Sequence, residues 1–474
     1  MSFLVARVRL PSSRLMPYST SFMHLHLFEF RACSSQSTME VVVISRDTIK
    51  PSLPTPPNLR HVQLSFLDQL NQRIFNPFIY FYTSDSSFNF ARLKKSLSEI
   101  LTGFYPLAGR LKDDLFVDCN DNGVDFFQAQ VNCKLSRLIE RPDYVEINKL
   151  LPYPEMDDCG DKLLAIQVNM FECNGIAIGL CFVRKVFDAL SMFTFVNNWA
   201  AKAREPDSNL IVYPKFDLAK LFPPRDMPGY EVVSLTAEKK KVYIAKGFVF
   251  SANALAALKA MYAANHSHLH PPPSRVESVS AFIWSRFMVA TQGDKARQVG
   301  KSYRVVQAVN LRPRANPPLP ETCVGNLSRF AMTVPSMEGT AEDGFGLITQ
   351  MREAIKMIDG DYVKELQEGN PNPKANHLDG KIKKAGKIGS FFTFTSVSKY
   401  PIYEADFGFG KPIWVTMGAQ PVGNVVVLMP TRSDDMQALI NMKRDELAKL
   451  EADRVFQAFV SPTFDAKVLL HSSL

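Results

Sequence analysis

Three charged side chains stand at the end of an apolar run and could do chemistry there. Arg184, Lys185 and Asp188 follow residues 176–183, an almost wholly apolar run that is typical of a strand buried on both faces. From Asp188 to Trp199 the apolar spacing becomes helical. Such a junction holds side chains at the head of a crevice, where α/β folds often place chemistry. Because an arginine stays protonated at neutral pH, Arg184 cannot accept a proton there.

Strand-like and helical patterns along the chain predict an α/β protein of two domains. A proline-dense passage over residues 213–229 is interpreted as the crossover between them. The predicted division is 39–212 for the N-terminal domain, 213–240 for the crossover linker and 241–474 for the C-terminal domain. Late in the chain we expect strands at 391–395, 412–416 and 424–429 in one sheet, then a helix over about 434–459.

Composition narrows the class of protein. The chain has 474 residues, of which 46% are hydrophobic and 22% charged, and these fractions are typical of a globular protein. No apolar run reaches the ~18–20 residues that a membrane span needs. The formal net charge of +8 comes with neither a basic stripe interleaved with aromatics nor a known module, so nucleic-acid binding is not expected. The excess lysines are interpreted as belonging to solvated surface loops. The alternative is that their positive charge helps to attract a phosphorylated cofactor.

Cysteine and histidine patterns give no support for a metal site. The seven cysteines form no CxxC pair, which argues against zinc and a disulfide framework and fits a reducing compartment. Cys173 and Cys181 are predicted to be small buried residues. His266, His268 and His270 alternate, but the three prolines that follow favour an exposed loop.

Several blocks of the sequence resemble the plant BAHD acyl-CoA-dependent acyltransferases, from about Met39 to the C-terminus. The family signature is His-x-x-x-Asp at the strand-to-helix junction, and here Arg184 stands at the histidine position. The blocks that carry the resemblance are Lys185, Asp188, Ala189, 191–193 and 198–200, FYPLAGRL at 104–111, NLRPR at 310–314, PPLPETCVGN at 317–326 and YEADFGFGKP at 403–412.

Two further motifs are similar to the family pattern with one substitution each. Asp406, Phe407, Gly408, Phe409 and Gly410 match Asp-Phe-Gly-Trp-Gly, with Phe409 in place of tryptophan, and the resemblance implies a structural loop. Upstream, the family commonly has Thr-Ser-Trp, where this chain has Thr395, Ser396 and then Val397. Thr395, Ser396 and Arg312 are carried over as candidates for cofactor binding.

The resemblance implies two similar domains, each a mixed β-sheet flanked by helices, as in chloramphenicol acetyltransferase. It also implies acyl-CoA as co-substrate, no permanently bound cofactor, a small-molecule acceptor and a monomer. In the family the histidine accepts the proton of a hydroxyl or amine that attacks the thioester. Asp188 is implied to be orienting rather than reactive, with Arg312 as its expected ion-pair partner.

Arg184 leaves several hypotheses for function. One is an acyltransferase, most similar to members that acetylate alkaloids and terpenoids, that works without the usual base, either on an amine or with Arg184 binding an anionic group or the developing oxyanion. The alternative is a catalytically inactive relative that binds a ligand or regulates a partner; a different reaction on a related ligand and an error in the sequence also remain. The eight histidines, at 24, 26, 61, 266, 268, 270, 377 and 471, are all remote in sequence from the junction.

The first 38 residues differ in composition from the rest. They are rich in serine and arginine and nearly free of acids, as in an organelle transit peptide, while Met39 begins a segment that looks like the family's usual opening. Residues 1–38 are therefore expected to be a disordered extension or a transit peptide. The predicted location is the cytoplasm, or a plastid or mitochondrion if the segment is a transit peptide.

Overall fold

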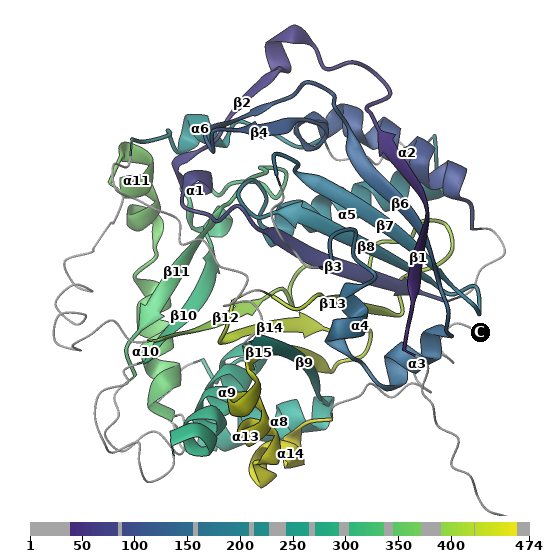
Figure 1. Cartoon of the computed structure of the whole chain (residues 1–474). Coiled ribbons are helices and arrows are strands. Elements are labelled where there is room, and N and C mark those ends of the chain that lie inside the picture. Colours follow the sequence, from purple (N-terminus) through teal and green to yellow (C-terminus); the bar gives the residue numbers. More distant parts are fainter. Residues whose placement is uncertain are drawn as a thin grey trace, which may run out of the picture. The chain divides into compact units, whose positions relative to one another are not determined.

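The computed structural model in Figure 1 describes residues 38–83, 88–154, 160–207, 213–226, 243–264, 271–292, 303–335, 345–370, 390–420 and 422–461. The predicted extension 1–38 lies almost wholly outside the described residues, as do parts of the crossover at 213–240. Residues from Met39 onward form one compact unit that contains two six-stranded sheets. The domain boundaries themselves stay a prediction.

The first sheet is mixed. Its strand order is β1-β6-β7-β8-β3-β13, and only the β6–β7 pair is parallel. The bounds are β1 Val41–Ile49, β6 Val124–Val131, β7 Leu164–Phe171, β8 Ile176–Val183, β3 Phe75–Tyr82 and β13 Trp414–Met417. The helices of this half are α1 Phe66–Gln69, α2 Phe90–Gly103, α3 Leu135–Glu140, α4 Tyr144–Asn148, α5 Ala189–Arg204 and α6 Leu218–Leu221. A small sheet joins β2 His61–Gln63, β5 Phe116–Asp118 and β4 Arg110–Lys112.

The centre of the first sheet follows directly from its sequence. Every residue of β3 and β8 is buried, as the apolar run 176–183 predicts. Helices α2 and α5 share a core with these strands, and Trp199 Nε1 donates to Leu93 O and to Ser96 Oγ, both at 3.2 Å. The end of β8 and the start of α5, where the charged residues lie, are therefore set in a tightly packed frame.

The second sheet is also mixed, with order β11-β10-β12-β14-β15-β9 and two parallel pairs, β10–β12 and β12–β14. Its strands are β9 Tyr243–Phe250, β10 Tyr303–Asn310, β11 Ser328–Thr333, β12 Ser390–Ser396, β14 Val425–Pro430 and β15 Met436–Lys443. Its helices are α8 Ala252–Ala264, α9 Arg275–Gln292, α10 Phe345–Lys356, α11 Gly360–Glu368, α13 Arg444–Ala452 and α14 Arg454–Phe459. Two mixed sheets flanked by helices confirm the predicted fold class.

The strand expected at 412–416 was assigned to the wrong sheet. It forms as β13, but it pairs antiparallel with β3 at the edge of the first sheet. Trp414 stacks on Phe81 with ring centroids 4.6 Å apart and planes 14° apart. A C-terminal segment therefore completes the N-terminal sheet. The order of strands along the chain could not predict this, because it does not show which sheet edge a late strand joins.

The long helix expected over about 434–459 is wrong in its first part. Residues Met436–Lys443 form β15, which lies between β14 and β9. Met436, Leu439 and Ile440 fit a helical spacing, but seven of the eight residues of this strand are buried, so tertiary packing overrides the local pattern. Two short helices, α13 and α14, follow, and Asp453 caps the second.

Cys181 is buried in β8 as predicted, but Cys173 is exposed because it belongs to the turn between β7 and β8. The five described cysteines are free, and the described residues hold no cluster of three or more side chains suited to a metal ion. None of the described helices is both long enough and apolar enough to cross a bilayer.

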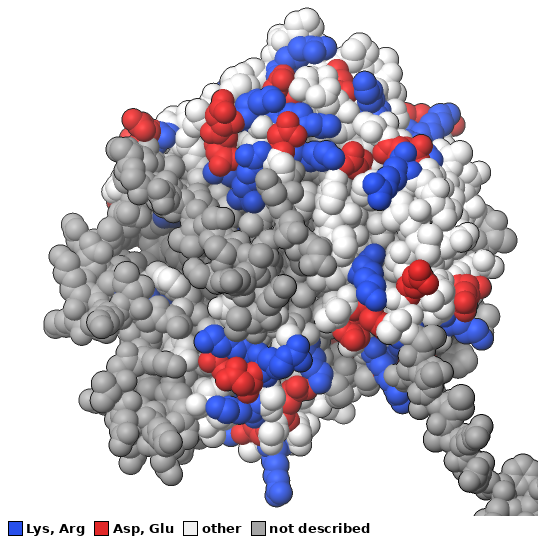
Figure 2. Space-filling model, viewed as in Figure 1, with Lys and Arg blue, Asp and Glu red and all other residues white. Residues whose placement is uncertain are grey.

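Surface charge is mixed in sign. Figure 2 shows lysine and arginine side chains interspersed with aspartate and glutamate on the visible described surface. Lys239–Lys241 and the lysines at 381, 383, 384 and 387 lie outside the described residues.

Candidate functional site

The junction between β8 and α5 is held from several sides. Arg184 N donates to Ile74 O at 2.9 Å, just before β3 begins, and the N–H groups of Val186 and Phe187 donate back to Val183 O at 3.2 and 3.4 Å. Asp188 is the N-cap of α5, and its Oδ1 accepts from Ser191 N at 2.9 Å and from Ser191 Oγ at 2.7 Å. The helix thus begins at a carboxylate cap, as N-terminal capping predicts.

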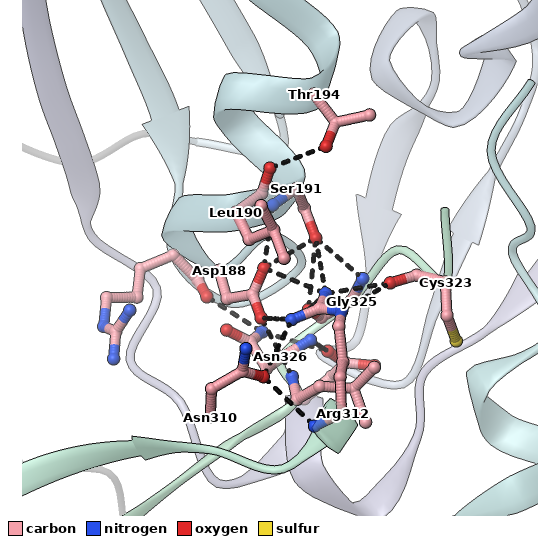
Figure 3. A network of polar contacts seen from close by, with 12 residues as sticks. Asp188, Leu190, Ser191, Thr194, Asn310, Arg312, Cys323, Gly325 and Asn326 are labelled. Carbon is pink, nitrogen blue, oxygen red and sulfur yellow. Dashed lines mark hydrogen bonds and ion pairs between the residues drawn. The ribbon is translucent and has the colours of Figure 1, made fainter. Parts of the chain in front are cut away.

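The ion pair expected between Asp188 and Arg312 is present. Arg312 Nη1 donates to Asp188 Oδ2 at 2.7 Å, and Nη2 donates to Oδ1 at 3.2 Å (Figure 3). The side chains are 2% exposed for Arg312 and 9% for Asp188. The two-pronged geometry joins the start of α5 to the segment that follows β10, so it connects residues of the two halves of the chain.

Arg312 has no donor group directed away from the protein. Its Nε and Nη2 donate to Cys323 O at 3.1 and 2.8 Å, Nη2 also reaches Ser191 Oγ at 3.2 Å, and Nη1 lies 3.5 Å from Asn310 Oδ1 (Figure 3). A guanidinium engaged in this way supports the loop. The expectation that Arg312 binds the cofactor stays a prediction.

Electrostatics in this pair favour the charged forms. Burial acts to raise the pKa of Asp188, but the charge and hydrogen bonds of Arg312, with those of Ser191, hold that pKa below its ordinary value. Burial acts to lower the pKa of Arg312, and Asp188 outweighs it, so the pKa of Arg312 is raised. Asp188 is therefore a carboxylate committed to one cation, which suits an orienting role.

Asn326 is a residue that sequence reasoning missed. Its Nδ2 donates to Arg184 O at 3.0 Å, to Lys185 O at 2.9 Å and to Asp68 Oδ1 at 2.9 Å. The side chain is fully buried. One amide therefore ties the backbone of the junction to a helix cap in the first half. In sequence Asn326 appeared only within a resembling block, and no spacing marks an amide that bonds to carbonyls 140 residues away.

Asp68 is a second buried carboxylate near the junction, and it too is fully engaged. Its Oδ2 accepts from Ser65 N and Ser65 Oγ in the capping box of α1, and its Oδ1 accepts from Asn326 N and Nδ2. Burial raises the pKa of Asp68, and the hydrogen bonds from Ser65 and Asn326 offset only part of that rise. Since all its acceptor positions face protein donors, Asp68 supplies structure rather than a free base.

Lys185 points into the protein. It is 3% exposed, and its Nζ donates to Gln69 O at 3.1 Å and lies 3.7 Å from Asp114 Oδ2. Burial lowers the pKa of Lys185, while Asp114 and Asp68 oppose that shift. This lysine is therefore a satisfied internal cation.

Arg184 differs from both of these cations. Its backbone is bonded at each end, yet within the described part of the chain its guanidinium makes no hydrogen bond and no ion pair, although the residue is only partly exposed. Burial lowers the pKa of Arg184, and the charge of Asp188 counters this only in part. The site therefore contains a partly enclosed positive charge that no described residue pairs with directly.

No replacement for a proton acceptor lies beside Arg184 among the described residues. His61 is the one described histidine, and it is exposed in the small sheet, stacked on Phe116 at 4.4 Å. The carboxylates near the junction are Asp188, Asp68 and Asp114, and each is engaged by protein donors or cations. The arrangement can orient a ligand and stabilise negative charge, but it offers no described base.

The other two cofactor candidates lie on the second sheet. Thr395 and Ser396 end β12, and Ser396 Oγ is 2.8 Å from Ser398 Oγ. In the described structure neither forms a hydrogen bond with Arg184, Asp188 or Arg312. Their proposed contact with a cofactor stays a prediction.

The loop of Asp406 to Gly410 packs on the first half of the chain. Asp406 Oδ1 accepts from Gly408 N at 2.8 Å and Gly410 N at 3.0 Å, and both glycines have positive φ, 96° and 92°. A Cβ on Gly408 would lie 2.8 Å from Arg92 Nη2. The positive φ at Gly408 favours glycine, whereas the terminal guanidinium of Arg92 could shift to make space for a side chain.

Both aromatic rings of this loop are buried against other rings. Phe407 meets Trp199 edge-on at 4.7 Å, and Phe409 meets Tyr82 edge-on at 4.9 Å. These contacts bind the loop to α5 and β3. They make its role in this structure one of packing.

Known proteins match nearly all of the described chain in sequence. A sequence model of the Transferase family matches residues 39–456. Stemmadenine O-acetyltransferase of Catharanthus roseus is 38% identical over 430 residues, which cover 87% of this chain and 97% of that protein. A limonoid 21-O-acetyltransferase of Melia azedarach is 33% identical over 440 residues, covering 90% of this chain and 99% of that protein.

A solved structure shows the same fold. The crystal structure of vinorine synthase, a protein whose Rauvolfia serpentina sequence also matches this chain, superposes with a TM-score of 0.76 at 33% identity. The match covers 90% of this chain and 99% of the vinorine synthase chain.

Proposed function

Because this chain belongs to the plant BAHD acyltransferase family, we propose that it transfers an acyl group from acyl-CoA to a hydroxyl or amine of a small plant metabolite. The acetyl group is the proposed acyl group, since several similar proteins are named as acetyltransferases. The class of acceptor is proposed to be a specialised metabolite such as an alkaloid or terpenoid. We further propose that the protein acts as a monomer in the cytoplasm.

The observation that carries the mechanism is the guanidinium of Arg184, which has no hydrogen-bond or ion-pair partner among the described residues, near a fully engaged Asp188. In the proposed step, the lone pair of the acceptor forms a bond to the thioester carbonyl carbon, and negative charge develops on the carbonyl oxygen. The C–S bond then breaks, and the departing coenzyme A thiolate takes up the proton that the acceptor loses. Arg184 acts on the developing charge, since preorganised positive charge is a large contributor to acyl transfer.

The remaining side chains of the junction orient rather than react. Their bonds fix where the Arg184 backbone lies. Asn326 donates to Arg184 O, Asp188 caps the following helix, and Arg312 is paired with Asp188. The missing proton acceptor is expected to cost the step about 10²–10⁴-fold in rate relative to a site with a positioned base. An amine acceptor, part of which is unprotonated in solution, suffers least from this loss.

A second candidate function follows from the same observation. With a permanent cation at the junction and no described imidazole beside it, the protein would be a catalytically inactive relative that binds a ligand or regulates a partner. This candidate predicts ligand binding without turnover.

Release of coenzyme A thiol from acetyl-CoA distinguishes the two candidates. The full-length protein, Arg184→His and Arg184→Ala are compared over a panel of alcohols and amines. Acceptor-dependent release by the natural chain that falls in Arg184→Ala supports transfer assisted by arginine. Release seen only in Arg184→His supports the inactive candidate. An increase in melting temperature on addition of coenzyme A checks separately that the thioester site is present.

A further inference from the structure

Two basic residues are adjacent in the junction and have opposite surroundings. Lys185 has a hydrogen bond to Gln69 O and an ion pair with Asp114. Arg184 has neither kind of contact in the described chain, although its backbone is fixed by Ile74 and Asn326. A long side chain whose backbone is hydrogen-bonded on both sides, and which has no partner among the described residues, is available to a ligand.

The carboxylates close to Arg184 cannot turn toward it without giving up existing partners. Asp188 is held by Arg312 through both oxygens and also accepts from Leu327 N at 3.2 Å. Asp68 uses both oxygens on Ser65 and Asn326. Arg184 therefore feels the charge of Asp188 at a distance but has no ion-paired or hydrogen-bonded carboxylate among the described residues.

We propose that Arg184 binds a carboxylate when the small-molecule ligand of this site carries one, and that its charge acts on the developing oxyanion only with ligands that lack that group. A planar guanidinium presents paired N–H donors that match the two oxygens of a carboxylate. Taking such a group would neutralise a cation that the fold otherwise leaves partly enclosed and unpaired. The inference rests on the proposed function, because it concerns a ligand of the same acyl-transfer site.

The carboxylate has two possible sources, which share the same chemistry. It can belong to the acyl group, as in a dicarboxylic half-thioester, or it can belong to the acceptor. Malonyl-CoA and acetyl-CoA form a matched pair for the first source, since they differ by one carboxylate. Mandelate and methyl mandelate form a matched pair for the second, since the ester removes the charge and keeps the hydroxyl.

Calorimetric titration of the full-length protein with each of these four probes measures binding without requiring turnover. The acceptor pair is titrated in the presence of coenzyme A. We expect the acid of at least one pair to bind about 10–100-fold more tightly than its uncharged counterpart, as a charge-assisted bidentate contact allows. Arg184→Gln is expected to abolish that preference, and Arg184→Lys to keep part of it, since lysine retains the charge and loses the fork.

Arg46→Gln is the control for net charge. Arg46 lies exposed on β1, three strands away from β8 in the first sheet, so its loss should leave the preference unchanged. Equal binding of acid and uncharged partner in both pairs overturns the proposal, and so does a preference that survives in Arg184→Gln.

Failure of the carboxylate proposal and failure of the proposed transferase function give different results. A carboxylate preference that depends on Arg184, found in a protein without acyl transfer, supports the carboxylate site and refutes the transferase. Acyl transfer to uncharged acceptors with no carboxylate preference in either pair does the reverse.

Discussion

Two arginines feel the charge of Asp188, and their side chains have opposite surroundings. Arg312 is 2% exposed and bonds to Asp188, Ser191 and Cys323. Arg184 is partly exposed and its guanidinium bonds to no described residue. The first guanidinium completes the internal network and the second is surplus to it. The contrast separates a cation that builds the site from one that is available for ligand chemistry, and it can be tested by substitution.

The largest expected effect on stability comes from substituting Arg312, the arginine of the internal network. Arg312→Met leaves Asp188 as a buried carboxylate without its cation, so the free energy of unfolding should fall by about 3–5 kcal/mol. Urea unfolding of the purified protein measures this. Arg314→Met is the matched control, because Arg314 belongs to the same short helix and, among the described residues, its side chain bonds only to Ile358 O at 2.9 Å. A loss no greater than that of Arg314→Met would show that the pair is not what holds the junction.

Substitution of Asn326, whose amide supports the same junction, should have the next largest effect on stability. Asn326→Leu removes the donor shared by Asp68 and the carbonyl groups of Arg184 and Lys185, and the expected loss is about 1–3 kcal/mol in free energy of unfolding. Asn197→Leu, on the partly exposed side of α5, is the control with a smaller expected loss, since the Asn197 side chain donates one hydrogen bond, to Pro401 O at 3.0 Å. Equal losses from the two substitutions would contradict a special role for Asn326.

The pH dependence of stability tests the electrostatic side of the contrast. The pKa of Asp188 is lowered in the folded state, so its contribution is fully present above the unfolded value of ~3.9 and is lost as pH falls through the folded value. The wild-type free energy of unfolding should therefore fall more steeply below about pH 4 than that of Asp188→Asn. Parallel curves for the two proteins would mean that Arg312 does not hold Asp188 charged.

The smallest expected effect on stability belongs to the other arginine. Arg184→Met removes a side chain without a described partner, so the free energy of unfolding should change by no more than about 0.5 kcal/mol in either direction. Thermal or urea unfolding of Arg184→Met and Arg312→Met, measured side by side, compares the two losses in free energy of unfolding directly. A loss comparable with that of Arg312→Met would place Arg184 in the structural network after all.

The fold was largely predictable because its strongest local signals agree with its packing. The apolar run 176–183 becomes a strand buried along its whole length, and Asp188 begins the following helix. The prediction failed where local pattern and tertiary context differ. Residues 436–443 have helix-like spacing but complete a sheet, and 414–417 cross to the other sheet.

The site was predictable only where a motif carried it. The pair of Asp188 and Arg312 was expected from two resembling blocks and is present at 2.7 Å. Asn326 and Asp68 could not be foreseen, since their bonds join segments 258 residues apart and no spacing in a single sequence encodes that contact. The roles of Arg184, Thr395 and Ser396 also remain predictions, because a side chain's chemistry toward a ligand depends on that ligand.

One measurement tests the central claim most directly: the rate of acceptor-dependent thiol release from acetyl-CoA by the natural chain and by Arg184→Met, with matched unfolding curves. If Arg184 supplies charge to the reaction, the substitution lowers the rate by at least about tenfold while the unfolding curves coincide. An unchanged rate in a fully folded Arg184→Met protein would contradict the claim that this arginine serves the chemistry.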